Sequence, residues 1–246
     1  MDRIAEFQKQ KQDNIEAARN DPDVQAFSRL WMRVVSKYKY AYNFSWLGRP
    51  IIQFPQDIVG IQEIIWTSKP DVIIETGIAH GGSLLLSASM LEMLGNDGLV
   101  IGIDIDIREH NRVAIEQHPL FKRDRIVMLE GSSTDMSIVE QVRKLISPMQ
   151  KVMVILDSNH THDHVLEELR IYSSFVTKGN YLVVFDTIIE DVPDDFFPDR
   201  QWGKGNNPKT AVREFLSTTN RFEVDHEMET KLLITVAPNG YLRCVE

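Results

Sequence analysis

The stretch "VMVILDSNHTHDHVLEEL", residues 152–169, determines how the rest of the chain is interpreted. It opens with five apolar residues and no polar alternation, which is typical of a β-strand that is covered on both faces. Asp157 follows directly, and three histidines and a second aspartate lie among residues 160–164. The stretch therefore predicts a buried strand that ends in a cluster of titratable side chains.

Four further apolar runs have an acidic residue at or next to their ends: "DVIIET" (71–76), "LVIGID" (99–104), "RIVMLE" (125–130) and "NYLVVFD" (180–186). Helix-like segments separate the runs, at about residues 82–95, 108–117, 134–146 and 161–177. This alternation predicts an α/β fold with a parallel sheet and right-handed crossovers. The carboxyl ends of parallel strands share one edge, where ligands bind, so the acids are candidates for one site. For any single acid, capping of the next helix is the alternative.

The two ends of the chain differ from this middle part. We expect residues 1–21 to form a solvated helix or a frayed arm, followed by a helix from Val24 and an ordered loop at 38–50. A further helix is predicted from Pro55 to Pro70. "RFEVDHEM" (221–228) and "KLLITVAP" (231–238) predict an antiparallel hairpin at the sheet edge with no helix between them. The predicted organisation is an N-terminal helical extension over residues 1–50 and one domain over 51–246.

Composition excludes several classes of protein. The chain has 246 residues, of which 43% are hydrophobic, so it can form a sizeable core. A formal charge of −9 disfavours nucleic acid as a partner, because phosphate backbones need a basic surface. The single cysteine fits a reducing compartment, and no signal peptide or membrane span is evident. We expect a cytoplasmic protein and a homo-oligomer.

A glycine-rich loop, "ETGIAHGGS" (75–83), follows the first of the five strands. It lacks the lysine of a phosphate-binding loop and the Gly-x-Gly-x-x-Gly spacing of a dinucleotide site. Gly77 permits a tight turn, and Gly81 and Gly82 allow close approach of a ligand at a helix N-terminus. At the end of the second strand, Asp104 is placed to accept hydrogen bonds from ribose hydroxyls.

After the third strand, Ser132 and Ser133 could line the edge of an adenine, although N-capping by Ser133 or Thr134 explains that segment equally well. Together the loops resemble those of an S-adenosylmethionine-dependent methyltransferase. The predicted cofactor contacts are Glu75, Gly77, His80, Gly81, Ser83, Asp104, Ser132, Ser133 and Asp157. The fold class is α/β, a Rossmann-like class I methyltransferase fold with a seven-stranded, mostly parallel sheet and a C-terminal antiparallel hairpin.

The chemistry is predicted at the ends of the fourth and fifth strands. Asp157 and Asp186 would supply hard oxygen ligands for Mg²⁺ or Ca²⁺, and His160 could take a proton from a substrate hydroxyl. Zinc is an alternative because His160 and His164 have the i, i+4 spacing of helix-borne ligands, but no third soft ligand is evident. His162 and His164 are otherwise expected to be surface or packing residues.

A long segment, residues 188–212, separates the fifth strand from the last helix and predicts a lid over the site. Trp202 could stack on a sugar, with Asp186 facing the acceptor. Alternatively, Trp202 and Phe196 only fix the loop to the core.

The sequence also resembles a known family. "VMVILDSNHTHDHVLEELRIYSSFVTKGNYLVVFDT" (152–187), with "WLGRPIIQFPQDIVGIQEII" (46–65), "ETGIAHGGS", "GIDID" and "WGKGNNPKTAV", is similar to the family of CmcI and the rhamnosyl O-methyltransferases, often labelled cephalosporin hydroxylase. The resemblance covers roughly residues 45–215. It implies S-adenosylmethionine as cofactor, usually a divalent metal, and the roles of metal ligand for Asp157 and base for His160.

One position departs from the family. The family usually has Glu-Asp at the end of strand five, both metal-binding, where this chain has Phe185 and Asp186. Loss of an anionic ligand weakens the attraction for a hard cation. Thr187, Glu190 or Asp191 could substitute, or His160 could act largely without a metal.

We therefore predict an enzyme, an S-adenosylmethionine-dependent O-methyltransferase acting on a sugar, a sugar-bearing natural product or a glycolipid. His160 is the predicted base, assisted by Mg²⁺ or another divalent cation, or acting largely alone if the loss of the glutamate at Phe185 leaves the metal weak or absent. The alternative is a non-catalytic accessory subunit that binds S-adenosylmethionine within a natural-product tailoring complex. A nucleotide-dependent oxidoreductase is disfavoured by the missing glycine fingerprint.

Overall fold

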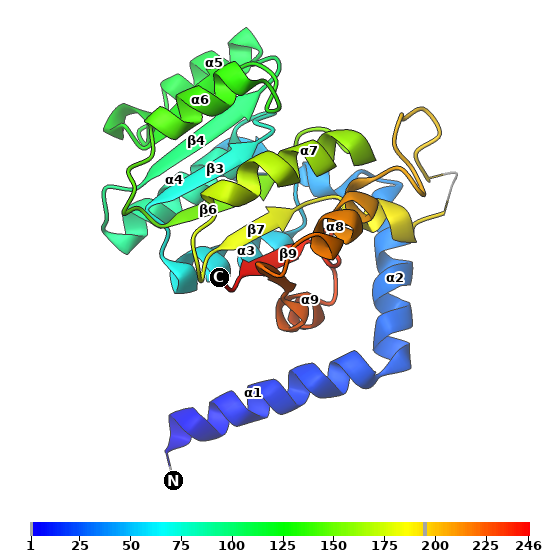
Figure 1. Cartoon of the computed structure of the whole chain (residues 1–246). Coiled ribbons are helices and arrows are strands. Elements are labelled where there is room, and N and C mark those ends of the chain that lie inside the picture. The colour runs from blue at the N-terminus through cyan, green and yellow to red at the C-terminus, as the bar shows by residue number, and fades with distance from the viewer. Residues whose placement is uncertain (1, 194–195) are drawn as a thin grey trace.

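A seven-stranded sheet forms the centre of the molecule, with strands in the order β5-β4-β3-β6-β7-β9-β8 (Figure 1). The computed structural model describes residues 2–193 and 196–246. The first five strands of the sheet in chain order are parallel, and β9 pairs antiparallel with both β7 and β8. The strands are β3 (Val72–Thr76), β4 (Leu99–Asp104), β5 (Ile126–Glu130), β6 (Val152–Leu156), β7 (Tyr181–Val184), β8 (Phe222–Val224) and β9 (Tyr241–Cys244). The predicted fold class and all five predicted parallel strands are confirmed.

Helices cover both faces of the sheet, which explains the lack of polar alternation in β3 and β6. Every residue of these two strands is buried. One hydrophobic core lies between the sheet and α3 (Pro55–Ser68), α4 (Gly82–Leu94), α5 (Glu109–Glu116) and α9 (His226–Leu232). The other lies against α6 (Met136–Lys144), α7 (His162–Tyr172) and α8 (Pro208–Ser217). The predicted crossover helices are confirmed, but α7 ends five residues early, before the 3-10 turn Ser173–Phe175.

The N-terminal part consists of α1 (Arg3–Asn20), α2 (Pro22–Ser36), a 3-10 turn (Tyr40–Asn43) and a small hairpin of β1 (Phe44–Trp46) and β2 (Arg49–Ile51). The prediction of a loop at 38–50 was therefore wrong for the residues of this hairpin. Leu47 and Gly48 connect its strands, and both have positive φ, 46° and 86°, as a tight two-residue hairpin turn requires. Among the helices of the described residues, none is long and apolar enough to cross a membrane.

The C-terminal hairpin is present, but its second strand was assigned to the wrong residues. Asp225 accepts a hydrogen bond from the Met228 amide at 3.0 Å and so caps α9, which occupies the segment between the strands. Met228 and Leu232 of α9 are buried against the core, which stabilises the helix there. "KLLITVAP" is thus the end of a helix and a loop, and the strand is Tyr241–Cys244.

The glycine loop passes directly beneath the end of β6. Gly77 has a φ of +94°, and a Cβ at this position would lie 2.1 Å from the carbonyl oxygen of Asp157. No side chain fits that separation. The loop and the segment that carries Asp157 are therefore packed backbone against backbone.

We predict that Gly77→Ala destabilises the fold more than Gly95→Ala does. Gly95 also has a positive φ, +72°, but a Cβ there would meet nothing within 4 Å. Gly95→Ala should lower the free energy of unfolding by only about 1–2 kcal/mol, from backbone strain. Gly77→Ala adds the steric overlap, about 1–3 kcal/mol more. Urea unfolding of both variants measures this difference, and equal effects would contradict the close packing.

Candidate active site

The ends of β6 and β7 bring together the three residues predicted to carry the chemistry. Asp157, His160 and Asp186 each place one ligand atom within 4.8 Å of the other two. His160 Nε2 lies 3.2 Å from Asp186 Oδ2. Asp186 has a φ of +56° and precedes the 3-10 turn η4 (Thr187–Asp191), so the chain turns sharply at this point. The predicted convergence of the two strand ends is present in the structure.

Negative charge is concentrated around Asp157. Burial raises the pKa of this carboxyl well above its usual range, and the neighbouring carboxylates of Asp186, Glu75, Glu168 and Asp57 raise it further. Each of these groups favours the neutral form of Asp157 because nearby like charges repel. A cation placed among them would oppose that shift. The electrostatics therefore fit a positively charged ligand at this edge of the sheet.

The donor set at Asp157, His160 and Asp186 consists of two carboxylates and one imidazole. Oxygen donors suit Mg²⁺, which usually keeps several water ligands and takes only one or two protein carboxylates. The residues present therefore fit a divalent cation. Phe185, at the position where the family resemblance predicts a glutamate, is 2% exposed and packs in the hydrophobic core.

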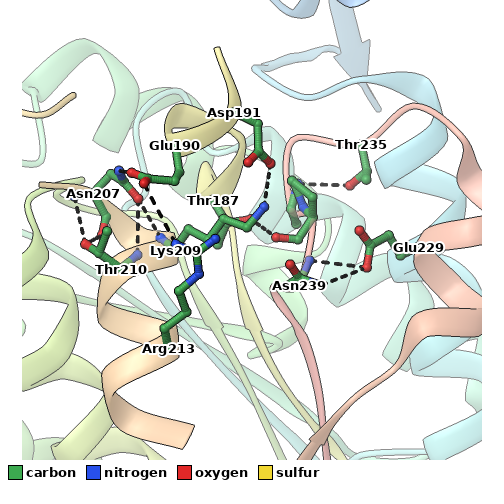
Figure 2. Close-up of polar contacts among 12 residues, drawn as sticks. Thr187, Glu190, Asp191, Asn207, Lys209, Thr210, Arg213, Glu229, Thr235 and Asn239 are labelled. Atoms are coloured by element: carbon green, nitrogen blue, oxygen red, sulfur yellow. Dashed lines mark hydrogen bonds and ion pairs between the residues drawn. The ribbon is translucent and has the colours of Figure 1, made fainter. Parts of the chain in front are cut away.

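The three residues predicted as substitutes for that glutamate are all engaged elsewhere (Figure 2). Their contacts hold η4 against α8 and against the segment before β9. These are Thr187 Oγ1 to Pro238 O at 2.7 Å, the Gly205 amide to Glu190 Oε2 at 2.8 Å, and Lys209 Nζ to Asp191 Oδ2 at 2.5 Å. Among the described residues, neither Glu190 nor Asp191 joins the cluster of ligand atoms formed by Asp157, His160 and Asp186.

The zinc alternative also fails on geometry. His160 precedes α7, which begins at His162, so His160 and His164 do not occupy one helical face. His164 Nε2 instead lies 3.1 Å from Ser133 Oγ and 3.3 Å from Ser158 Oγ.

The glycine loop carries a buried acid with a free oxygen. Glu75 is 1% exposed, its Oε1 accepts a hydrogen bond from Ser83, and its Oε2 has no hydrogen-bond partner. Burial raises the pKa of Glu75 to about 7, and the Ser83 hydroxyl partly opposes this. An unpartnered buried carboxylate oxygen fits a cationic ligand such as an amino acid ammonium group.

Two residues that the sequence analysis missed hold this loop in place. Arg49 of β2 donates from Nε to the His80 carbonyl at 2.9 Å and from Nη2 to Asn111 Oδ1 at 2.8 Å. Asn111 of α5 is 3% exposed and donates from Nδ2 to the Ala79 carbonyl at 2.9 Å. Nothing local in the sequence marks either residue, because both contacts join distant segments. The His80 side chain lies 3.3 Å from Asn111 Oδ1.

The loop glycines at 81 and 82 are required by protein packing. A Cβ on Gly81 would lie 2.4 Å from Ile115 Cδ1, and one on Gly82 would lie 2.3 Å from the Pro50 carbonyl oxygen. Both glycines are thus needed for the packing of neighbouring parts of the chain, and the approach of a ligand to this loop stays a prediction.

Asp104 lies beside the glycine loop and is hydrogen-bonded to it. Its Oδ2 accepts from the amides of Ile78 at 2.8 Å and Ala79 at 3.1 Å, and its Oδ1 accepts from the Asp106 amide at 3.2 Å. The carboxylate joins the ends of β3 and β4, and it remains half-exposed at the edge where a ribose is predicted.

In the loop after β5, Ser132 and Ser133 differ in burial and in the residues they contact. Ser133 is buried, with its hydroxyl near His164 and its carbonyl accepting from Tyr172 Oη at 2.7 Å. Ser132 is half-buried and lies 3.0 Å from the Thr134 hydroxyl. The capping alternative was wrong, because Asp135 caps α6 by accepting from the Ser137 amide.

Trp202 of the predicted lid lies against His160. The two rings are 4.8 Å apart between centroids at 85°, an edge-to-face contact, and Arg200 lies 5.0 Å over the indole. Asn206, four residues after Trp202, accepts a hydrogen bond from the His162 amide at 2.8 Å, which ties this part of the chain to the start of α7. Trp202 therefore forms one side of the site.

Comparison with known proteins identifies the class. The family model described as rhamnosyl O-methyltransferase/CmcI matches residues 38–245. A rhamnosyl O-methyltransferase of Mycobacterium tuberculosis is 32% identical over 188 residues, which cover 76% of this chain and 72% of the relative. The rhamnosyl O-methyltransferase of Mycobacterium leprae is 30% identical over 199 residues, covering 80% and 82%.

Solved structures agree with the fold. An apo structure of CmcI has a TM-score of 0.60 at 21% identity, covering 83% of this chain and 77% of that one. A CmcI structure with Mg and S-adenosylmethionine has a TM-score of 0.58 at 20% identity, covering 83% and 78%.

The fold and the family together define the chain as an S-adenosylmethionine-dependent O-methyltransferase, which confirms the prediction of an enzyme. The chain belongs to the rhamnosyl O-methyltransferase/CmcI family, as its sequence motifs predicted.

The raised pKa of Glu75 predicts a pH dependence of stability. The folded state keeps a proton on this carboxyl up to about pH 7, whereas the unfolded chain releases it near pH 4.5. The contribution to stability is therefore present below about pH 4.5 and is lost as pH rises to about 7. The full shift corresponds to about 3 kcal/mol.

Glu75→Gln removes this ionisation and should flatten the fall in unfolding free energy between pH 4.5 and 7. Urea unfolding of wild type and variant across that range, without added ligand, measures the slope. An unchanged slope in Glu75→Gln would show that the carboxyl does not titrate as inferred.

Proposed function

We propose that the chain transfers the methyl group of S-adenosylmethionine to a sugar hydroxyl, with His160 as general base and a divalent cation at Asp157 and Asp186. The convergence of these three side chains at one edge of the sheet carries the proposal. The supporting comparisons are the rhamnosyl O-methyltransferases that are 32% and 30% identical to this chain over 188 and 199 residues.

His160 would act through the nitrogen that does not face Asp186. Because Nε2 lies 3.2 Å from the Asp186 carboxylate, the negative charge favours the tautomer with the proton on Nε2, and the lone pair then remains on Nδ1. Nδ1 can then take the proton of the acceptor hydroxyl while the oxygen forms its bond to the methyl carbon. The bond between that carbon and sulfur breaks, and the electron pair stays on the sulfur, which becomes neutral.

The cation would be held by Asp157 and Asp186, and it would lower the pKa of a hydroxyl bound beside them. Coordination by Asp186 and its contact with His160 are compatible because a carboxylate has two oxygens. The chain itself contributes positioning, which supplies most of the rate in a transfer without a covalent enzyme intermediate.

Cofactor contacts are proposed on both sides of this centre. Glu75 would bind the ammonium of the methionine moiety through its unpartnered oxygen. Gly77, His80, Gly81 and Ser83 form the loop around that end, Asp104 would face the ribose, and Ser132 and Ser133 the adenine. Trp202 offers an aromatic wall to the acceptor, which suits the CH groups of a sugar ring.

His160→Ala should lower the turnover of methyl transfer by about 10²–10⁴-fold, the usual contribution of a general base. Its affinity for S-adenosylhomocysteine should stay within about threefold of wild type. Transfer of labelled methyl to rhamnosides and calorimetric binding of S-adenosylhomocysteine measure the two quantities.

His162→Ala provides the matched control for that variant. The His162 ring contacts Thr210 and Glu214 of α8, so its removal leaves the proposed base in place. We expect transfer within about tenfold of wild type. Equal losses in both variants, or loss of cofactor binding in His160→Ala, would contradict the assigned role.

Removal of divalent cations with EDTA should reduce transfer, and Mg²⁺ should restore it, because the carboxylates bind the ion. Asp186→Asn should weaken Mg²⁺ binding in calorimetry by at least about tenfold, since a charged donor is lost. Asp191→Asn is the control, because Asp191 pairs with Lys209. Full activity in EDTA would contradict a role for the metal in transfer. His160 would then be the main catalytic residue.

A further inference from the structure

The N-terminal helices lie at the edge of the fold, where α1 contacts α9 through a hydrogen bond from Gln12 Nε2 to Glu227 Oε1 at 2.8 Å. Figure 1 shows α2 beside the body and α1 crossing below it from the lower end of α2. Neither helix contains a buried residue. The family model begins at residue 38, so both helices precede the part of the chain that the family shares. The proposed site for methyl transfer uses no residue of either helix, so the helices need a separate explanation.

Helix α2 has an apolar surface that is wider than its contact with the body, with an inner part that packs on the body and an exposed outer part. On the inner face, the Trp31 ring lies 5.1 Å from that of Tyr40 and 6.0 Å from that of Phe54. On the outer face, Phe27 is 71% exposed, Leu30 is 56% exposed and Val34 is 46% exposed. A helix that packs on a body along one side normally has a polar outer side. The outer stripe of Phe27, Leu30 and Val34 therefore needs another partner.

The charges at the ends of this stripe indicate the partner. Asp23 lies seven residues before Leu30 and Lys37 seven residues after it, a spacing that keeps all three on one helical face. Both charged side chains are exposed, and the backbone of Lys37 still has α-helical angles. The stripe is thus acidic at its N-terminal end, apolar in the middle and basic at its C-terminal end.

We propose that α2 pairs antiparallel with α2 of a second copy of this chain, about a two-fold axis at Leu30. In this arrangement each Leu30 faces its equivalent, Phe27 lies near the partner's Val34, and Asp23 lies opposite the partner's Lys37. The surface is self-complementary, as a two-fold interface must be. A parallel pairing would place like charges together at both ends and is disfavoured.

The pairing involves only one four-turn helix from each copy, so it buries less than the roughly 1,600 Å² of a standard interface. We therefore expect a reversible dimer with a dissociation constant in the micromolar range. The proposal does not depend on the methyl transfer.

Sedimentation velocity from about 1 to about 100 μM tests the pairing over that range of affinity. Wild type should shift with concentration from the 28.3 kDa chain to twice that mass. Leu30→Glu should remain monomeric, since it places two carboxylates on the axis. Arg29→Glu, an exposed charge reversal on another side of α2, should dimerise like wild type.

A charge swap tests the antiparallel register. Asp23→Lys and Lys37→Asp should each weaken dimerisation, and the double variant should restore it, while circular dichroism melting verifies that each variant is folded. A monomer at all concentrations would overturn the proposal, as would a dimer that Leu30→Glu does not affect or a double variant that does not recover. Cosedimentation of monomers with phosphatidylcholine–phosphatidylglycerol vesicles would assign the stripe to a lipid surface instead.

Discussion

The site depends on the parallel pairing of β6 with β3 on one side and β7 on the other. The registers place Leu156 level with both Thr76 and Val184. The hydrogen bonds continue one residue past the strands, from the Asp157 amide to the Thr76 carbonyl at 2.9 Å and from the Phe185 amide to the Leu156 carbonyl at 3.0 Å. Asp157 and the residue before Asp186 are thereby fixed to the sheet itself. Loops could not hold these carboxylates at such short separations with comparable rigidity.

This geometry concentrates buried acids, and that concentration opposes folding. Asp57, Glu75 and Glu168 are each at most 1% exposed, and all three act on the pKa of Asp157. The pKa of Asp57 is also raised, to about 6, mainly by burial. Burial of carboxyls without a counter-charge costs free energy, which the two hydrophobic cores must offset. Cationic ligands that bind only the folded state would relieve this repulsion and stabilise the fold.

Much of the fold and of the central site follows from short-range patterns in the sequence. Continuous apolar runs revealed the five parallel strands, and the shared edge of a parallel sheet placed Asp157 beside Asp186. The three-residue strands of the 44–51 hairpin carry too little pattern, and Gly48 and Pro50 are equally typical of loops. Likewise, "KLLITVAP" has the composition of a strand, and only the cap at Asp225 and the packing of Met228 make the preceding residues helical.

The contacts that sequence patterns missed are those between distant segments. Arg49 and Asn111 reach the glycine loop from β2 and α5. Buried Glu168 accepts from the Ser158 hydroxyl at 2.7 Å, so α7 is tied to the segment after β6. None of these pairs has a characteristic spacing along the chain, and each exists only once the fold is formed.

The central claim is that the strand ends hold an acceptor hydroxyl between a methyl donor and His160. A crystal structure with S-adenosylhomocysteine, Mg²⁺ and a rhamnoside tests it most directly. The account predicts one ion bound by Asp157 and Asp186, and an acceptor oxygen between the sulfur and the imidazole, within about 3.2 Å of Nδ1. A sulfur on the opposite side of Asp157, or an acceptor bound away from His160 and Trp202, would contradict it.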